Sequence, residues 1–386
     1  ESVLARQSEV QAARASGPVR KLSLSLANLG LALFDAGAYD EGVQAFEEAV
    51  TLASDLDDAP FRVQVLSVKA LAFQAIGRFH NAYEVAEEIL HAAEELNDAG
   101  MLCDALTTEA QILVQSGEPV IARDKLAHAR RLALEAGDKR RQINVAAVWA
   151  NAYTAEAALS DAALYLQMAC DLARELQDAP VEAEQLIHLG TVLKWQSCQA
   201  EAADVFQRAL DIAACHSLPQ FELAALSGLT ECYAHLDDAA QVLVYAERGA
   251  PLAAELHDSD AAFKLLEAVT LAAYRTGDMT LANEALGKAL ALARSLPDRN
   301  KEADLLVNLG EAYLVSEQLD QALRVYHEAL DCARRLKRPR DEAYLVGRIG
   351  FVHAEQGALE EALRFQEQAL ELARQSHLDE LEADQL

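Results

Sequence analysis

The sequence predicts an all-α solenoid, because one unit recurs nine times at a constant period of 40 without an insertion. Steps of 40 from Gly30, Gly42 or Ala49 meet a small residue at nearly every position. The first series continues with Ala70, Ala110, Ala150, Gly190, Thr230, Thr270, Gly310 and Gly350. A fixed period of this size is typical of solenoids, in which each unit stacks on its neighbours. The functional question for such a chain is therefore which of its surfaces binds a partner, and which partner it binds.

The period also predicts the domain organisation. Residues 21–380 are expected to form nine repeats and a single elongated domain, since each unit contacts only its neighbours. Residues 1–20 form a half-unit or N-terminal helix, because residues 3–16 are in phase with the second helix of a unit. Residues 381–386 are expected to be the truncated start of a further helix, or a tail. Ends in mid-unit without polar caps favour a fragment of a longer polypeptide.

Each unit is expected to fold as a helical hairpin. In residues 301–340, apolar residues three and four apart mark the inward side of a first helix: Ala303, Leu305, Leu306, Leu309, Ala312 and Tyr313. A second helix is expected over residues 319–336. Other units carry a glycine at the break between the helices, which suits a C-cap with positive φ: Gly37, Gly77, Gly117, Gly277 and Gly357.

The connectors between units contain acidic residues and prolines. Aspartate recurs at one place, where its carboxylate can accept hydrogen bonds from the free N–H groups of the next helix: Asp58, Asp98, Asp138, Asp178, Asp258 and Asp298. Proline nearby stops the preceding helix from continuing. The connectors are therefore predicted to end one helix and begin the next.

Composition and charge exclude several classes of protein. With 33 basic and 62 acidic residues, the formal net charge is −29, so phosphate backbones and anionic membranes would be repelled. No apolar run approaches the roughly 18 residues of a transmembrane helix, and no segment resembles a signal peptide. The six cysteines form no CxxC pair, so we expect reduced core thiols and a cytoplasmic location. The abundance of alanine favours a bacterial source.

Motifs for catalysis or metal binding are absent from the sequence. It contains no GxSxG, phosphate-binding GxxxxGK[ST] or HExxH motif. His80 and His91 are too far apart to bind one metal ion from a single helical face. We therefore expect no enzyme activity, no cofactor and no metal.

The repeated positions resemble the tetratricopeptide repeat. Unit eight has residues matching that pattern at six places: Leu309, Gly310, Tyr313, Ala322, Tyr326 and Ala329. Units two, four and six depart most, since they lack the glycine or the aromatic residue. The length of the period is similar to that of LGN/Pins-type adaptors and MalT-type bacterial regulators. The resemblance implies a right-handed superhelix whose first helices line a concave groove for a protein or peptide segment.

Outward-facing polar residues of the first helices are therefore the candidate partner-binding residues. They are Asn28, Gln64, Asp104, Asn144, Asn151, Glu184, His188, Lys194, Lys264, Arg275, Asn308 and Arg348. Asparagine is a poor helix former, because its side chain competes for backbone groups, so its recurrence here needs a reason. A carboxamide can donate to and accept from a bound peptide backbone. The alternative is solvation, or pairing between asparagines of adjacent helices.

Four cations form a second candidate set on the same side: Lys194, Lys264, Arg275 and Arg348. They could hold a carboxylate or an acidic motif. The alternative is charge balance against nearby acidic residues, namely Glu231, Glu267 and Glu311.

Two tryptophans and one basic run need separate interpretation. Trp149 is in phase with core leucines and is expected in the core. Trp195 is either a ligand platform or a packing residue, and packing is favoured. The five basic side chains within residues 334–340 lie at a predicted helix end, where capping and solvation are favoured over a docking patch.

The sequence thus predicts a binding scaffold that holds an extended or helical segment in a preformed groove. One alternative is the sensor region of a larger signalling or transcription-regulating protein, which would bind a small effector or a peptide. Another is a structural module that self-associates through uncapped ends into homo-oligomers.

Overall fold

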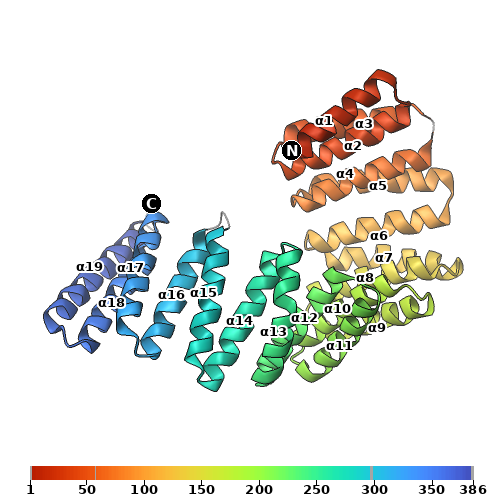
Figure 1. The fold of residues 1–386 in the computed structure, drawn as a ribbon. Helices are drawn as coiled ribbons and strands as arrows, with labels where there is room; N and C mark the ends of the chain where they lie inside the picture. Colours follow the sequence, from red (N-terminus) through yellow and green to blue (C-terminus); the bar gives the residue numbers. More distant parts are fainter. Residues whose placement is uncertain (1, 57, 296–298, 384–386) are drawn as a thin grey trace. The chain divides into compact units, whose positions relative to one another are not determined.

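The computed structural model describes residues 2–56, 58–295 and 299–383, and every regular element in this part is an α-helix (Figure 1). The chain divides into two compact units, Glu1–Ser197 and Cys198–Leu386. The helices of the first unit are α1 (Ser2–Ser16), α2 (Val19–Asp35), α3 (Tyr39–Ser54), α4 (Ala59–Ala75), α5 (Phe79–Leu96), α6 (Ala99–Gln115), α7 (Pro119–Glu135), α8 (Lys139–Ala155), α9 (Leu159–Glu175) and α10 (Ala179–Trp195). Those of the second are α11 (Gln199–Cys215), α12 (Pro219–His235), α13 (Ala239–Glu255), α14 (Ser259–Thr276), α15 (Met279–Ser295), α16 (Arg299–Val315), α17 (Leu319–Arg335), α18 (Pro339–Glu355) and α19 (Leu359–Ala383).

From α2 onwards, the helices begin at evenly spaced positions, so that two successive helices fill one period of the sequence. We call the even-numbered helices A helices, and the odd-numbered ones from α3 onwards B helices. The predicted all-α array of helical hairpins is confirmed, and the first hairpin begins at Val19, slightly before the predicted start at Lys21. The single elongated domain over residues 21–380 stays a prediction. None of the described helices is long and apolar enough to cross a membrane.

The two ends of the chain compare differently with the sequence. Residues 2–16 form α1, a helix in the phase of a B helix, as expected. At the other end, α19 continues through Ala383 without a break near residue 381, where a further helix was expected to begin. Residues 384–386 lie outside the described part.

One left-handed turn recurs at the ends of many helices. Gly37 has φ 78°, and the other glycines predicted at this place also have positive φ. Residues with side chains take the same conformation in other turns, for example Ala157 (φ 59°) and Glu317 (φ 57°). A left-handed residue with a side chain costs roughly 1–2 kcal/mol, so the array retains this turn even where the sequence does not favour it.

Aspartate caps the helix that follows a connector, as predicted. The carboxylate of Asp98 accepts hydrogen bonds from the N–H groups of Gly100 (2.8 Å) and Met101 (3.0 Å). Equivalent bonds form at Asp58, Asp138, Asp178 and Asp258, whereas Asp298 lies outside the described residues. The structure adds Asp238 and Asp278, which cap B helices in the same way. These bonds satisfy N–H groups that have no partner within the helix.

A and B helices approach each other closely where a glycine of the A helix faces a ring of the B helix in the same hairpin. A Cβ added at Gly30 would lie 2.8 Å from the Phe46 ring, and one at Gly310 would lie 2.5 Å from the Tyr326 ring. Phe46 and Tyr326 are both 0% exposed. The ring therefore occupies the volume that a larger A-helix residue would need.

Among the residues whose burial is described, one charged side chain is wholly buried. Glu109 of α6 is 0% exposed, and its Oε1 lies 2.7 Å from the Nζ of Lys125 on α7. Burial and the nearby Glu109 carboxylate raise the pKa of Tyr83 to about 12. Nothing in the sequence indicated this ion pair, because Glu109 follows two threonines on a helix with several other polar residues.

We expect Ala157→Gly to raise the free energy of unfolding by about 1 kcal/mol, because glycine adopts positive φ without the steric cost of a Cβ. Urea unfolding followed by circular dichroism measures the change. Ala147→Gly, in the middle of α8, serves as the control and should lower stability by about 1 kcal/mol. Equal effects of the two variants would contradict the role of the turn.

Gly310→Ala should lower the free energy of unfolding by about 2 kcal/mol, because the new methyl group overpacks against Tyr326. In the double variant Gly310→Ala/Tyr326→Leu, the loss should be smaller than the sum of the two single losses by about 1 kcal/mol. Thr270 and Leu286 occupy the same two positions one unit earlier in the sequence, so a larger A-helix residue already occurs there with a leucine. Strict additivity would show that the two side chains do not compete for space.

Candidate functional site

The predicted amide and histidine candidates lie on the exposed side of the A helices. Their side chains are exposed and have no hydrogen bond or ion pair with another described residue: Asn28, Gln64, Asn144, Asn151, His188 and Asn308. Asn144 and Asn151 are two helical turns apart on α8, so they project from one side of that helix. These amide groups are thus available to a partner, and their binding role stays a prediction.

The predicted cations behave differently from one another. Arg275 bonds the backbone carbonyl of Ala234 and pairs with Asp237. Arg348 pairs with Glu311, as the charge-balance alternative proposed. Lys264 is exposed, with no pair to a described residue, and Lys194 is half-buried. The two arginines are therefore occupied within the chain, which leaves Lys264 as the accessible cation of this set.

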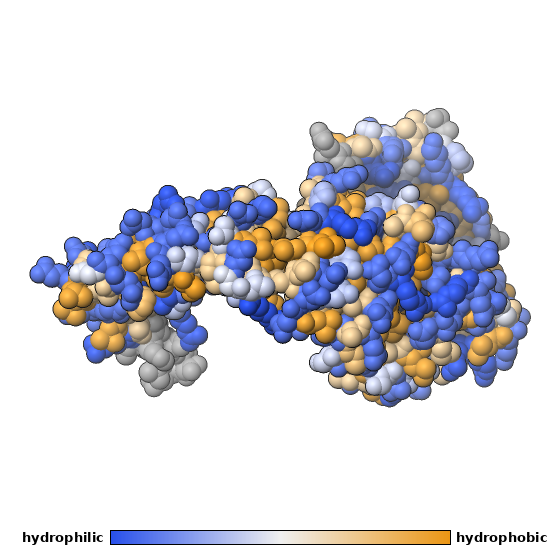
Figure 2. All heavy atoms as spheres, turned by 60° about the horizontal axis from the view of Figure 1, so that its bottom comes forward, coloured by the Kyte–Doolittle hydropathy of each residue, from blue (hydrophilic) through white to orange (hydrophobic). Residues whose placement is uncertain are grey.

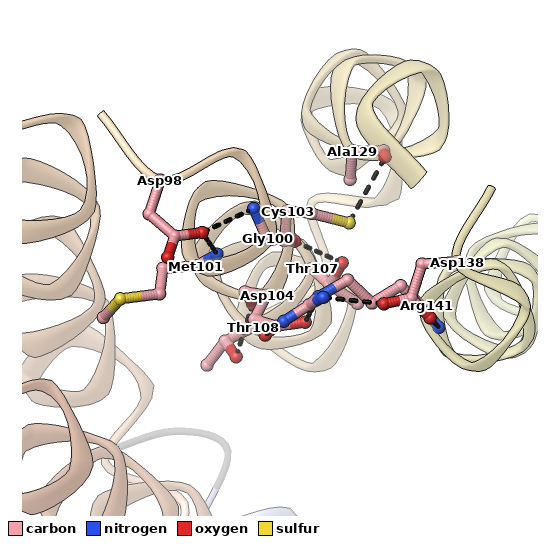
Figure 3. Close-up of polar contacts among 10 residues, drawn as sticks. All are labelled: Asp98, Gly100, Met101, Cys103, Asp104, Thr107, Thr108, Ala129, Asp138 and Arg141. Atoms are coloured by element: carbon pink, nitrogen blue, oxygen red, sulfur yellow. Dashed lines mark hydrogen bonds and ion pairs between the residues drawn. The ribbon is translucent and has the colours of Figure 1, made fainter. Parts of the chain in front are cut away.

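Asp104, another outward-facing residue of an A helix, is held by an arginine of the next A helix (Figure 3). Arg141 donates from Nε and Nη2 to the two carboxylate oxygens of Asp104, both at 2.9 Å. Its Nη1 also bonds Asp138 at 2.7 Å. Hydrogen bonds from the Arg141 backbone N–H and guanidinium lower the pKa of Asp138. Arg141 thus joins α6 to the start of α8.

The two tryptophans have opposite environments. Trp149 is buried and its ring stacks on Tyr165, with centroids 5.3 Å apart, which confirms the predicted core position. Trp195 is 57% exposed, so the favoured packing role is wrong for most of its ring. Trp195 is the last residue of α10.

The basic run of residues 334–340 is largely neutralised. Arg334 bonds Glu342 at 2.8 Å, and Arg338 bonds Asp304 at 2.8 Å. Lys337 takes the left-handed conformation that ends α17. The favoured capping interpretation therefore explains more of these residues than a docking patch does.

A pocket of about 690 Å³ opens between the A helices α14 and α16 in the second unit, and we call it the α14–α16 pocket. It is lined by Asp260, Phe263, Lys264, Leu266, Glu267, Thr270, Leu271, Tyr274, Leu286, Ala289, Lys301, Asp304, Leu305, Asn308 and Glu311. It brings together Lys264 and Asn308, two of the predicted residues. Its volume falls in the range of small-molecule and peptide sites, roughly 300–1,000 Å³.

Hydrophobic side chains are accessible on and beside this pocket. Leu271 is 36% and Tyr274 37% exposed on α14, and Tyr344 and Phe351 of α18 are also exposed. Figure 2 shows hydrophobic side chains as separate patches among hydrophilic ones on the visible face. An accessible apolar surface beside amides and charges is typical of a recognition site.

The pocket's charged residues are mostly paired. Lys301 bonds Asp260 at 3.1 Å, and its ammonium lies 4.6 Å from the centroid of the Phe263 ring. Burial, with a smaller contribution from Glu311, raises the pKa of Tyr274. No group of three or more His, Cys, Asp or Glu residues that could hold a metal ion occurs in the described ranges.

Next to the pocket, one carboxylate connects three helices. Glu311 of α16 accepts hydrogen bonds from the phenols of Tyr326 (2.7 Å) and Tyr344 (2.9 Å) and pairs with Arg348. The Arg348 guanidinium lies 5.3 Å from the centroid of the Phe351 ring. Burial and the bond to Glu311 raise the pKa of Tyr326 above its usual range. We call these residues the Glu311 network.

Comparison with known proteins agrees with this geometry. The tetratricopeptide-repeat family model matches residues 24–56. No curated protein sequence matches the chain. The match lies within the first helical hairpin, α2 and α3, and confirms the predicted resemblance to the tetratricopeptide repeat there.

Solved structures share the fold at low sequence identity. A Signal Transduction ATPase with Numerous Domains (STAND) protein with a tetratricopeptide repeat sensor, from Pyrococcus horikoshii, aligns over 89% of this chain with a TM-score of 0.63 and 13% identity. This chain spans 55% of that protein. RapI in its apo form aligns over 92% of this chain and 98% of its own (TM-score 0.60, 14% identity). Aspartyl phosphate phosphatase F from Bacillus subtilis aligns over 90% and 93% (TM-score 0.52, 12% identity).

The α14–α16 pocket was not predicted from the sequence, although the sequence contains one signal for it. Three of its lining residues occupy repeat positions at which the next unit has bulkier or charged side chains: Leu271, Asp304 and Asn308. Comparison of units at these positions, rather than of polarity alone, would have indicated an open space. The helix period gives the side of a residue but not the depth of the surface around it.

Arg348→Met should lower the free energy of unfolding by about 2 kcal/mol, because Glu311 would lose its charged partner in a half-buried network. Thermal and urea unfolding measure the loss. The control Lys264→Met removes an exposed cation of the same set and should change stability by less than about 0.5 kcal/mol. If both variants were equally stable, the ion pair would not hold α16 and α18 together.

Proposed function

We propose that this chain is a protein- or peptide-binding module, and that the exposed side of its A helices is the binding surface. The α14–α16 pocket is the observation that carries the proposal, because it places Lys264 and Asn308 beside accessible apolar side chains. Asn144 and Asn151 on α8 extend the same chemistry in the first unit. The helices are held by bonds within the chain, so a partner would meet a preformed surface.

In this mechanism the amides hold the backbone of the bound segment. A carboxamide offers one acceptor and two donor hydrogens, which matches the alternation of N–H and C=O groups along a peptide. Side-chain specificity comes from the pocket. Of the cations that the sequence suggested for reading acidic groups, Arg275 and Arg348 are engaged within the chain, so this role is assigned to Lys264.

A sensor role is the second candidate. The STAND protein that shares this fold is described as having a tetratricopeptide repeat sensor, and this chain spans 55% of its length. In such a role, a ligand on the A-helix side would be read by other parts of a larger protein, and the chain itself would have no catalytic function. Self-association through the end helices remains a further proposal, as does a cytoplasmic, bacterial setting.

Panning of a random peptide library on the full-length chain tests the proposed surface. Binding of the selected peptides is expected to weaken by about tenfold or more, roughly 1.4 kcal/mol, in Lys264→Ala/Asn308→Ala or Asn144→Ala/Asn151→Ala. Replacement of asparagine by alanine favours the helix, so loss of binding would not result from unfolding.

The matched control is Gln44→Ala, which removes an exposed amide from the B helix α3. Its peptide affinity should equal that of the wild type, as measured by isothermal titration calorimetry. Equal affinity of all four proteins would place binding elsewhere. Failure to select any peptide would contradict the proposed function.

A further inference from the structure

The repeat itself shows what fills a space like the α14–α16 pocket. One unit later, the corresponding place between α16 and α18 holds the Glu311 network. Four lining residues of the pocket correspond one by one to its members: Leu271 to Glu311, Leu286 to Tyr326, Asp304 to Tyr344, and Asn308 to Arg348. The same backbone arrangement is therefore filled in one unit and open in the previous one.

The α14–α16 pocket and the Glu311 network differ in the size and shape of the side chains at these corresponding positions. Tyr326 is 0% exposed, and the Arg348 guanidinium lies 6.0 Å from the ring centroids of both Tyr326 and Tyr344. At the pocket, the ring of Tyr344 is replaced by the short side chain of Asp304, and the phenol of Tyr326 by a leucine. The ring that the pocket lacks is therefore that of Tyr344, since Thr270 stands at the position where Gly310 makes room for the Tyr326 ring in the next unit.

The charges at the pocket favour an uncharged occupant. Asp260 is paired with Lys301, Asp304 with Arg338, and Glu311 with Arg348. The remaining charges in the lining, Lys264 and Glu267, have opposite sign and lie exposed about one turn apart on α14. Leu271 replaces the carboxylate that holds Arg348 in the next unit, so a cation entering the pocket would lose water without gaining that partner.

We propose that the α14–α16 pocket binds an aromatic side chain of a protein or peptide partner. Phe263 and Tyr274 supply ring edges and faces for offset or edge-to-face contacts, and Leu271, Leu286 and Leu305 supply apolar walls. Asn308 lies where it can bond the backbone next to the inserted ring. The proposal rests on the proposed function, and it adds the chemical class that the binding surface selects.

N-acetyl amides of phenylalanine, tyrosine, tryptophan, leucine, arginine and glutamate, titrated against the full-length chain by ligand-observed NMR, test this selectivity. The aromatic amides should bind about tenfold more tightly than the other three. The variant Leu271→Glu/Asp304→Tyr/Asn308→Arg copies the next unit at exposed positions and should abolish this binding. The single variant Asp304→Tyr, which changes one exposed residue, should weaken it in the same direction.

The control is Glu184→Tyr, which adds the same ring at the same repeat position on α10, outside the pocket, and should bind the aromatic amides like the wild type. Tighter binding of the leucine or arginine amide would overturn the aromatic assignment. So would aromatic binding that the pocket-filling variants leave unchanged, or an absence of binding by every amide.

Peptide selection separates failure of this inference from failure of the proposed function. Selected peptides that need Asn144 and Asn151 but contain no aromatic residue would overturn the inference and leave the binding function standing. An absence of both selected peptides and amide binding would overturn both.

Discussion

Within each unit, the structure depends on the close approach of the A and B helices of a hairpin. A glycine of the A helix faces an aromatic ring of the B helix at Gly30 with Phe46 and at Gly310 with Tyr326. Interiors are packed as densely as organic crystals, so volume added to one helix must be removed from the other. This complementarity lets residue identity vary between units while the spacing of the helices along the chain stays constant.

Because the helices keep their positions in every unit, the units can differ in the side chains on the exposed side of the A helices. The Glu311 network and the α14–α16 pocket occupy equivalent places in successive units, yet one is closed by rings and a guanidinium and the other is open. Functional differences between repeats can therefore arise from a few side chains without a change of fold. A pocket in such an array is best interpreted against the neighbouring unit, which shows what the same backbone accommodates.

Electrostatics stabilises the contacts between A helices and also limits what they can recognise. Arg141 joins α6 to α8, and Arg348 joins α16 to α18. An arginine that holds a neighbouring carboxylate is no longer available to a partner, because its departure would leave an uncompensated charge in a half-buried site. Exposed amides and the apolar walls of the α14–α16 pocket, rather than the arginines, are therefore the main elements of the proposed surface.

The sequence by itself determined the repeat, the helical hairpins, the left-handed turns and the aspartate caps, because these follow from local chemistry repeated in phase. It also placed Asn151 and Asn308 on an exposed side, since the helical period fixes the direction in which each side chain leaves the helix. Only the tertiary structure decided that Arg275 and Arg348 are paired, that Trp195 is exposed, and that a pocket lies between α14 and α16. Those outcomes depend on which side chains from different helices meet, and helical period carries no information about distances between helices.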